Sequence, residues 1–263
     1  LLEHGEKKGK KSVVCETEWL NNYILIELNN VEVKDSDFYM RLQNADLGNG
    51  SINNWVDFSN IFMNISWNPV HFFDADKIEW NIRVGDAHEW EKFVDLFEKE
   101  HTLTPQDIVI ADDKKALCLW GIMWWLNSWV TAETKNILVE IANFDPVRIR
   151  KTWVRLWLRS DSELRNEKHI APTYSLYALL LFLDELKFYA KDLGNYEIGG
   201  VSSYVKPWLH PVKPTTITVD WDNMNKFIFG ADDKKPDFQE KASGILQNLW
   251  FKVEWNSVTV PLW

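Results

Sequence analysis

The hydrophobic positions of this chain follow one period in its first third and a different period in its middle. Between residues 21 and 86, apolar residues tend to alternate with polar ones, which is the two-residue period of a half-buried strand. The clearest such run places four apolar residues on one face: Ile78, Trp80, Ile82 and Val84. Residues 23–34 and 37–43 also favour strands, and the Asn-, Gly- and Asp-rich stretch at 45–54 is typical of turns. We therefore predict an antiparallel, β-rich section over residues 21–86.

From residue 87 to residue 194 the pattern becomes helical. One helical face of the segment 88–100 would collect four apolar side chains: Trp90, Phe93, Val94 and Phe97. Thr104–Pro105 and Asp145–Pro146 each join a capping side chain to a proline suited to a first helical turn, so a helix is expected from each, and another from Thr131. A long apolar run starts at Tyr174 and ends at Gly194, a residue suited to a helix C-terminus. These signals predict a central helical bundle over residues 87–194.

The two ends of the chain have sequence patterns that differ from those of its first third and its middle. Residues 195–263 begin with a proline-rich stretch that should run extended, and continue with a strand near 215–221, a helix near 236–250 and a strand near 251–260. We expect this section to pack on the same core. Residues 1–20 form a lysine-rich polar arm that we expect to be flexible. The predicted class is therefore α+β, with a β-rich section, a helical core and a mixed α/β ending.

Composition and charge narrow the functions to be considered. The chain has 263 residues, 46% of them hydrophobic, and a formal net charge of −10, which argues against a protein that coats nucleic acid over its whole surface. Two cysteines, Cys15 and Cys118, could form one disulfide or none, and the apolar run around Cys118 favours a reduced, buried thiol and hence a reducing, intracellular compartment. The longest apolar runs fall short of the roughly 20 residues of a membrane span, so we expect a soluble protein.

One segment departs from the acidic character of the chain. Residues 147–168 carry seven Lys and Arg residues against three acidic ones. On a helical wheel four cations share one side: Arg148, Lys151, Arg155 and Arg159. The opposite side is apolar and should be packed inside: Ile149, Trp153, Leu156 and Trp157. Such a row suits binding of phosphates or of a carboxylate-rich partner, and the alternative is a solvated face that pairs with acidic segments of the same chain.

Other candidate sites are weaker. Asp220 and Asp222 follow a predicted strand and could hold a divalent cation, although a turn or helix-start role explains them as well. Trp55 and Trp67 lie in an Asn-rich region and could stack on a sugar ring, although a core role also explains them. His71 belongs to a cluster with Asp74, Asp76 and Glu79 that we interpret as a turn. No nucleophile elbow, phosphate-binding glycine loop or zinc pattern is present.

These observations favour a non-catalytic protein that works by association. The leading hypothesis is a structural, assembly or interaction protein that binds a copy of itself, a protein partner or a nucleic-acid strand through the basic helix, with no cofactor. The first alternative is a metal-dependent enzyme acting on a phosphoester or a sugar nucleotide through Asp220 and Asp222. The second alternative is a carbohydrate-binding protein that uses Trp55 or Trp67.

Overall fold

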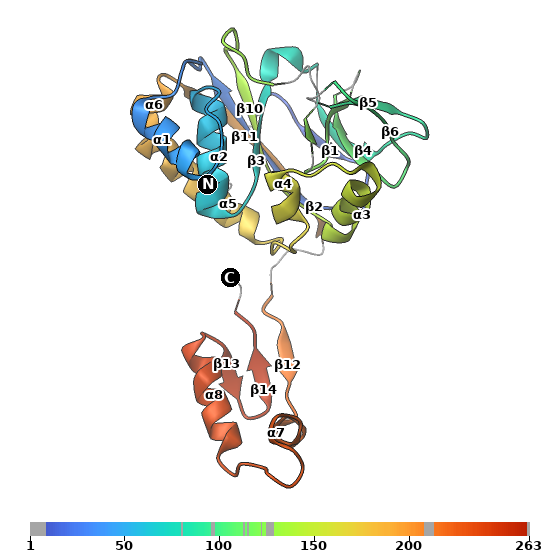
Figure 1. Ribbon diagram of the computed structural model, residues 1–263, viewed down its shortest axis with the longest axis vertical. Coiled ribbons are helices and arrows are strands. Elements are labelled where there is room, and N and C mark those ends of the chain that lie inside the picture. Colours follow the sequence, from blue (N-terminus) through green and yellow to red (C-terminus); the bar gives the residue numbers. More distant parts are fainter. Residues whose placement is uncertain are drawn as a thin grey trace. The chain divides into compact units, whose positions relative to one another are not determined.

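The computed structural model describes residues 9–79, 81–95, 98–112, 114, 116–121, 123–124, 129–207 and 213–261. The chain forms two compact units, Leu1–Leu209 and His210–Trp263 (Figure 1). Among the described residues, the larger unit contains a four-stranded sheet, a five-stranded sheet and a two-stranded hairpin, and the smaller unit contains a three-stranded sheet.

The larger unit is built around a four-stranded antiparallel sheet. Its order is β11-β2-β10-β3, and its strands are β2 (Leu20–Asn29), β3 (Val70–Asp74), β10 (Ile137–Phe144) and β11 (Glu197–Val205). Every residue of β3 and β10 is buried, and so is nearly all of β2. Because both faces of these strands are covered, their sequences are almost continuously apolar rather than alternating. The exceptions on the buried strands, His71 and Glu140 among them, are therefore informative.

Helices cover one face of this sheet (Figure 1). They are α1 (Phe38–Asp46), α2 (Asn54–Ser66), α5 (Tyr174–Phe188) and α6 (Ala190–Leu193). The layer is held by an aromatic cluster in which Phe58, Phe72 and Phe182 contact one another, with ring centroids 5.7–6.4 Å apart. Asn53 fixes the start of α2, because its side chain accepts hydrogen bonds from two backbone amides of the first turn. None of the described helices is both long enough and apolar enough to cross a membrane.

A second core lies on the other face of the sheet. It is shared with a five-stranded sheet of order β1-β4-β7-β8-β9. These strands are β1 (Val13–Cys15), β4 (Ile82–Asp86), β7 (Ile108–Ala111), β8 (Ala116–Leu119) and β9 (Met123–Trp124). A two-stranded hairpin, a 3-10 turn and two helices complete the unit: β5 (Lys92–Val94), β6 (Glu100–Thr102), η1 (Ala75–Lys77), α3 (Pro146–Leu156) and α4 (Asp161–Asn166).

The smaller unit combines a three-stranded antiparallel sheet with two helices. The sheet has the order β12-β14-β13, and the elements are β12 (Thr216–Thr218), α7 (Trp221–Phe229), α8 (Phe238–Asn248), β13 (Lys252–Glu254) and β14 (Ser257–Thr259). Trp221 anchors α7 to the hairpin, because its indole is buried and its Nε1 donates to the carbonyl of Trp255 at 3.0 Å.

The predicted α+β class is confirmed, while several predicted elements are wrong. Strands β5 to β10 occupy the region in which helices were expected from 88, 104 and 131. Strands β7 and β8 are short and buried on both faces, so their sequences are continuous apolar runs. Periodicity alone does not distinguish such a run from a buried helix. The strand predicted over 37–43 is α1, and the predicted polar arm contains β1. Trp80 and Phe97, used in those predictions, lie outside the described residues.

Candidate functional site

The basic segment is helical as predicted, but the helix is shorter than the cationic row. Asp145 caps α3, because its carboxylate accepts a hydrogen bond from the backbone amide of Arg148 at 2.9 Å. The helix ends at Leu156, and Trp157 follows it in a left-handed conformation. Arg159 therefore lies beyond the helix, and the prediction of four cations along one helix is wrong for this residue.

The chain itself engages three of the four predicted cations. The guanidinium of Arg148 stacks over the ring of Trp19, 4.3 Å from its centroid, and that of Arg159 stacks over Trp153 at the same distance. Arg155 forms an ion pair with the buried carboxylate of Asp107. No ion pair or hydrogen bond joins the exposed amine of Lys151 to any residue in the described ranges. Arg155 thus pairs with a carboxylate of the same chain, as the alternative interpretation expected, whereas Arg148 and Arg159 stack on tryptophan rings.

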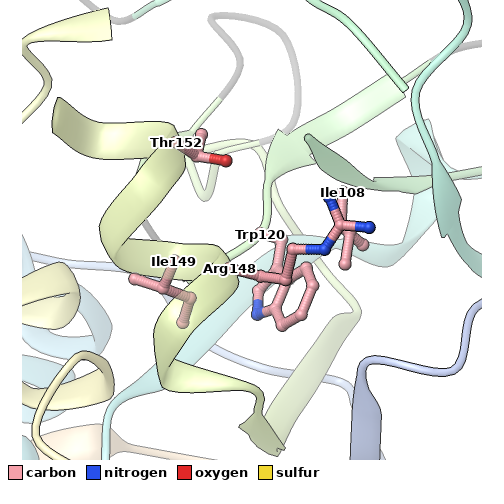
Figure 2. Close-up of a pocket in the computed structure, with 5 residues that line it drawn as sticks. All are labelled: Ile108, Trp120, Arg148, Ile149 and Thr152. Carbon is pink, nitrogen blue, oxygen red and sulfur yellow. The ribbon is translucent and has the colours of Figure 1, made fainter. Parts of the chain in front are cut away.

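The apolar side of α3 is only partly inside. Ile149 and Leu156 are buried, as predicted, and Trp153 is half-buried with its Nε1 donating to Glu167 at 3.0 Å. Trp157 is 85% exposed, so its predicted place in the core is wrong. Arg148, Ile149 and Thr152 line a small hollow together with Ile108 and Trp120 (Figure 2). That hollow is too small to hold a water molecule and is not a ligand site.

The two aspartates proposed as metal ligands have local roles. Asp220 caps α7 by accepting a hydrogen bond from the backbone amide of Asn223 at 3.0 Å. The carboxylate of Asp222 contacts Lys226 and Lys234 at 2.7 and 2.6 Å, and these ammonium groups lower its pKa. Across the described residues, no group of three His, Cys, Asp or Glu side chains is placed to hold a metal ion. The helix-start interpretation fits both residues.

The two tryptophans proposed for sugar binding differ from each other. Trp55 is fully buried in α2, and its Nε1 donates to the carbonyl of Glu32 at 3.1 Å. It is unavailable for stacking on a sugar, so the core interpretation holds for Trp55. Trp67 is 53% exposed and therefore not a core residue, and the guanidinium of Arg165 lies 4.9 Å from its ring centroid.

A polar cluster that the sequence analysis did not find lies on the central sheet. His71 of β3 pairs directly with Glu140 of β10 in the strand register, and the His71 Nδ1 lies 3.4 Å from a Glu140 carboxylate oxygen. The other ring nitrogen of His71, Nε2, lies 3.1 Å from the hydroxyl of Ser162, at the start of α4. The Tyr23 hydroxyl donates to the second carboxylate oxygen of Glu140 at 2.9 Å. His71, Glu140 and Tyr23 are all buried.

Helix α4 places Ser162 in this cluster. Ser160 caps the helix, since its hydroxyl accepts a hydrogen bond from the amide of Glu163 at 3.1 Å. Asn166 lies one turn beyond Ser162, with its side-chain nitrogen 3.5 Å from the Ser162 hydroxyl and 3.4 Å from the carbonyl of Gly121. Burial, and secondly the charge of Glu167, raises the pKa of Glu163 to about 7. Burial, and secondly Glu140, raises the pKa of Tyr23 well above its ordinary value.

The order hydroxyl, imidazole, carboxylate is the arrangement of a nucleophile, its general base and the group that orients the base. The 3.1 Å separation of Ser162 and His71 is within hydrogen-bond reach. His71 lies in β3 and not in the predicted turn, and no motif in the sequence links it to Glu140 or Ser162. The useful signal was an ionisable residue within an otherwise apolar run, at Glu140 in β10.

The chain matches one protein family model and is similar to several known proteins. A family model described as the B3/4 domain matches residues 20–191. The chain is 32% identical over 262 residues to the phenylalanine–tRNA ligase beta subunit of Latilactobacillus sakei, covering 97% of this chain and 31% of that protein. It is 37% identical over 225 residues to the phenylalanine–tRNA ligase beta subunit of Thermotoga maritima, covering 85% of this chain and 27% of that protein.

The chain thus spans about a third of the length of the curated relatives that it matches. A solved structure of an N-terminal fragment of the phenylalanyl-tRNA synthetase beta subunit from Pyrococcus horikoshii aligns with 98% of this chain and 70% of that chain, at 13% identity and a TM-score of 0.41, a likeness too distant to assign residues. The family model covers well over half of the chain, from the first residue of β2 to the middle of α6. The chain belongs to the B3/4 domain family.

Proposed function

We propose that this chain is a section of a phenylalanine–tRNA ligase beta subunit and that it works by association, with a protein partner and with tRNA. The observation that carries the proposal is the similarity to two such beta subunits, which in one case extends over 97% of the chain. A beta subunit by definition joins another subunit, and a tRNA ligase must hold tRNA. Both roles agree with the association that the charge pattern favours.

The surface proposed for tRNA is the exposed side of α3 and the segment after it. Arg150 and Lys151 are exposed on the helix, and Arg159 is exposed just beyond it. Stacking over Trp153 leaves the edge of the Arg159 guanidinium able to donate to a phosphate. Arg155 is a poorer candidate, because its ion pair with buried Asp107 would have to break.

Titration of labelled tRNA with the chain at several salt concentrations tests this surface. The charge reversals Arg150→Glu, Lys151→Glu and Arg159→Glu should each weaken binding and each lower the salt dependence by about one counterion. Lys187→Glu is the matched control, because Lys187 is an exposed cation on α5, away from α3 in the sequence. Equal binding by all four variants would contradict the assignment of this surface, and light scattering of the same samples reports self-association.

A second candidate function is hydrolysis of an ester, favoured by the His71–Glu140–Ser162 geometry. The bond that an aminoacyl-tRNA ligase makes is an ester, and such ligases can use a second site to hydrolyse wrong products. In this role the Ser162 hydroxyl would attack the ester carbonyl and pass its proton to His71 Nε2, 3.1 Å away. The proton would then go to the departing tRNA hydroxyl, and water would release the acyl group from Ser162. Glu140 would orient the imidazole from the other side.

Deacylation of tRNA esters by the chain tests this candidate. His71→Ala should abolish any deacylation by the wild-type chain, whereas His88→Ala, a change of an exposed histidine outside the cluster, should leave it unchanged. Ser162→Ala distinguishes two routes, since an equal loss indicates a serine nucleophile and retained activity indicates water activated by His71. Deacylation that persists in His71→Ala, or a wild-type chain that does not accelerate it, would refute the proposed hydrolysis.

A further inference from the structure

Tryptophan dominates an unusual set of backbone conformations in this chain. Among the described residues, eight that are not glycine have positive φ, and the three that are not tryptophan are Asn30, Glu98 and His169. The other five are tryptophans: Trp67 at 60°, Trp90 at 67°, Trp157 at 56°, Trp250 at 66° and Trp255 at 55°. Glycine adopts these values readily and Asn, Asp and His adopt them at times, but a bulky side chain there is an outlier.

Each of these positions is one where glycine is the usual residue. Trp67 and Trp157 follow the last residues of α2 and α3, the position of a left-handed helix cap. Trp250 lies two residues after the end of α8. Trp255 is the first residue of the two-residue turn between β13 and β14, where a positive φ at the first position calls for glycine. Trp90 lies in the turn before β5.

The indoles at these five positions are also mostly in solvent. Their exposed fractions are 53% for Trp67, 73% for Trp90, 85% for Trp157, 79% for Trp250 and 87% for Trp255. Trp55, Trp120 and Trp221 form a contrasting group, with exposed fractions of 0%, 3% and 8% and negative φ. Tryptophan is normally a highly buried residue. The chain therefore contains two groups of tryptophans. Those of the first group are buried and have an ordinary backbone conformation, whereas those of the second group are exposed and have a backbone conformation that suits glycine.

We propose that glycine occupies positions 67, 90, 157, 250 and 255 in the protein that its own cell makes, because the codon at these positions is UGA and is read there by a glycine tRNA. UGA differs from the tryptophan codon UGG only in its third base. It is a stop codon in the standard code, and it is read as tryptophan in some codes and as glycine in others. A single change of codon meaning thus accounts for all five positions.

Composition agrees with this reassignment. Glycine makes up roughly 7% of an average protein, or about 18 of 263 residues, whereas this chain has 11 glycines and 16 tryptophans. Moving five residues from one type to the other gives 16 glycines and 11 tryptophans. Use of the indoles to bind a partner would be a different explanation, but it would account only for their exposure. It would not place them at positive φ, in helix caps and tight turns, in both units of the chain.

The test compares the codon in the gene with the residue in the purified protein at each of these positions. In the gene, we expect TGA at the five positions and TGG at positions 55, 120 and 221. In the protein purified from its own cells, peptide mass spectrometry should find the glycine mass at the five positions and the tryptophan mass at the three buried ones. TGG codons at the five positions, or peptides there with the mass of tryptophan, would overturn the inference.

Discussion

The left-handed conformation of Trp157 gives a sharp prediction about stability. Trp157→Gly should make the larger unit more stable than Trp157→Ala by about 1 kcal/mol, because both variants lack the indole and only alanine keeps a Cβ that clashes at positive φ. The comparison with alanine is needed because it isolates the backbone from the loss of the side chain. Trp153, which lies inside α3, supplies the reverse case, since glycine inside a helix is about 1 kcal/mol less favourable than alanine.

The indole itself should contribute little at position 157. It is 85% exposed in the folded chain, and a denatured chain already buries roughly 10–40% of its surface. Folding therefore removes almost no additional area of this side chain from water. Relief of a left-handed conformation is worth about 1–2 kcal/mol, and the greater freedom of glycine in the unfolded chain offsets about 0.4–1 kcal/mol of it. We expect the Trp157→Gly chain to exceed the chain with Trp157 in stability by about 1 kcal/mol or slightly less.

Urea denaturation followed by far-ultraviolet circular dichroism measures these differences without relying on tryptophan fluorescence, which the substitutions alter. With a denaturant slope of about 1–3 kcal/mol per molar urea, 1 kcal/mol moves the midpoint by roughly 0.3–1 M. The sign should reverse between the two positions, with glycine above alanine at 157 and below it at 153. Glycine below alanine at position 157 would refute the argument that the backbone there requires a residue without a Cβ.

Two further predictions concern buried ionisable groups. Asp107→Ala should cost about 2–4 kcal/mol in the free energy of unfolding, measured by urea denaturation, because the Asp107 carboxylate binds Arg155, Thr152 and Thr104 at a buried site. A loss below about 1 kcal/mol would contradict that role. Burial raises the pKa of Glu163 to about 7, above its unfolded value of roughly 4.3. The protonated Glu163 therefore contributes its full stabilisation of the folded state below about pH 4, and this stabilisation is lost as the pH rises through 7. In thermal unfolding between pH 5.5 and 8.5, Glu163→Gln should therefore flatten the decline in the midpoint of the wild type, and an unchanged decline would show that Glu163 does not cause it.

Local chemistry made some elements predictable from the sequence. The cap and proline at Asp145–Pro146 act within one helical turn, and they correctly marked the start of α3. Gly194 correctly marked the end of the helical run that begins at Tyr174. Strands β7, β8 and β10 could not be recognised in this way, because both of their faces are buried and their nearly continuous apolar runs lack the two-residue period.

The candidate sites show the same difference between features set by neighbouring residues and features set by the tertiary fold. The cations of α3 could be found because they are neighbours in the sequence, although their partners Trp19 and Asp107 could not. The polar cluster could not be found, because pairing of β3 with β10 brings His71 to Glu140, and a separate helix brings Ser162. Nothing in the spacing of these three residues along the chain reveals that they meet.

The central sheet of the larger unit is covered by other layers on both of its faces, and this determines how its amide protons exchange with solvent. Neither layer can lift away from β2 and β10 without exposing one of the two cores. Amides in the middle of these strands should therefore exchange with deuterium only when the entire unit opens. Those of the short β5–β6 hairpin, which pairs with no other described strand, should exchange through small local openings.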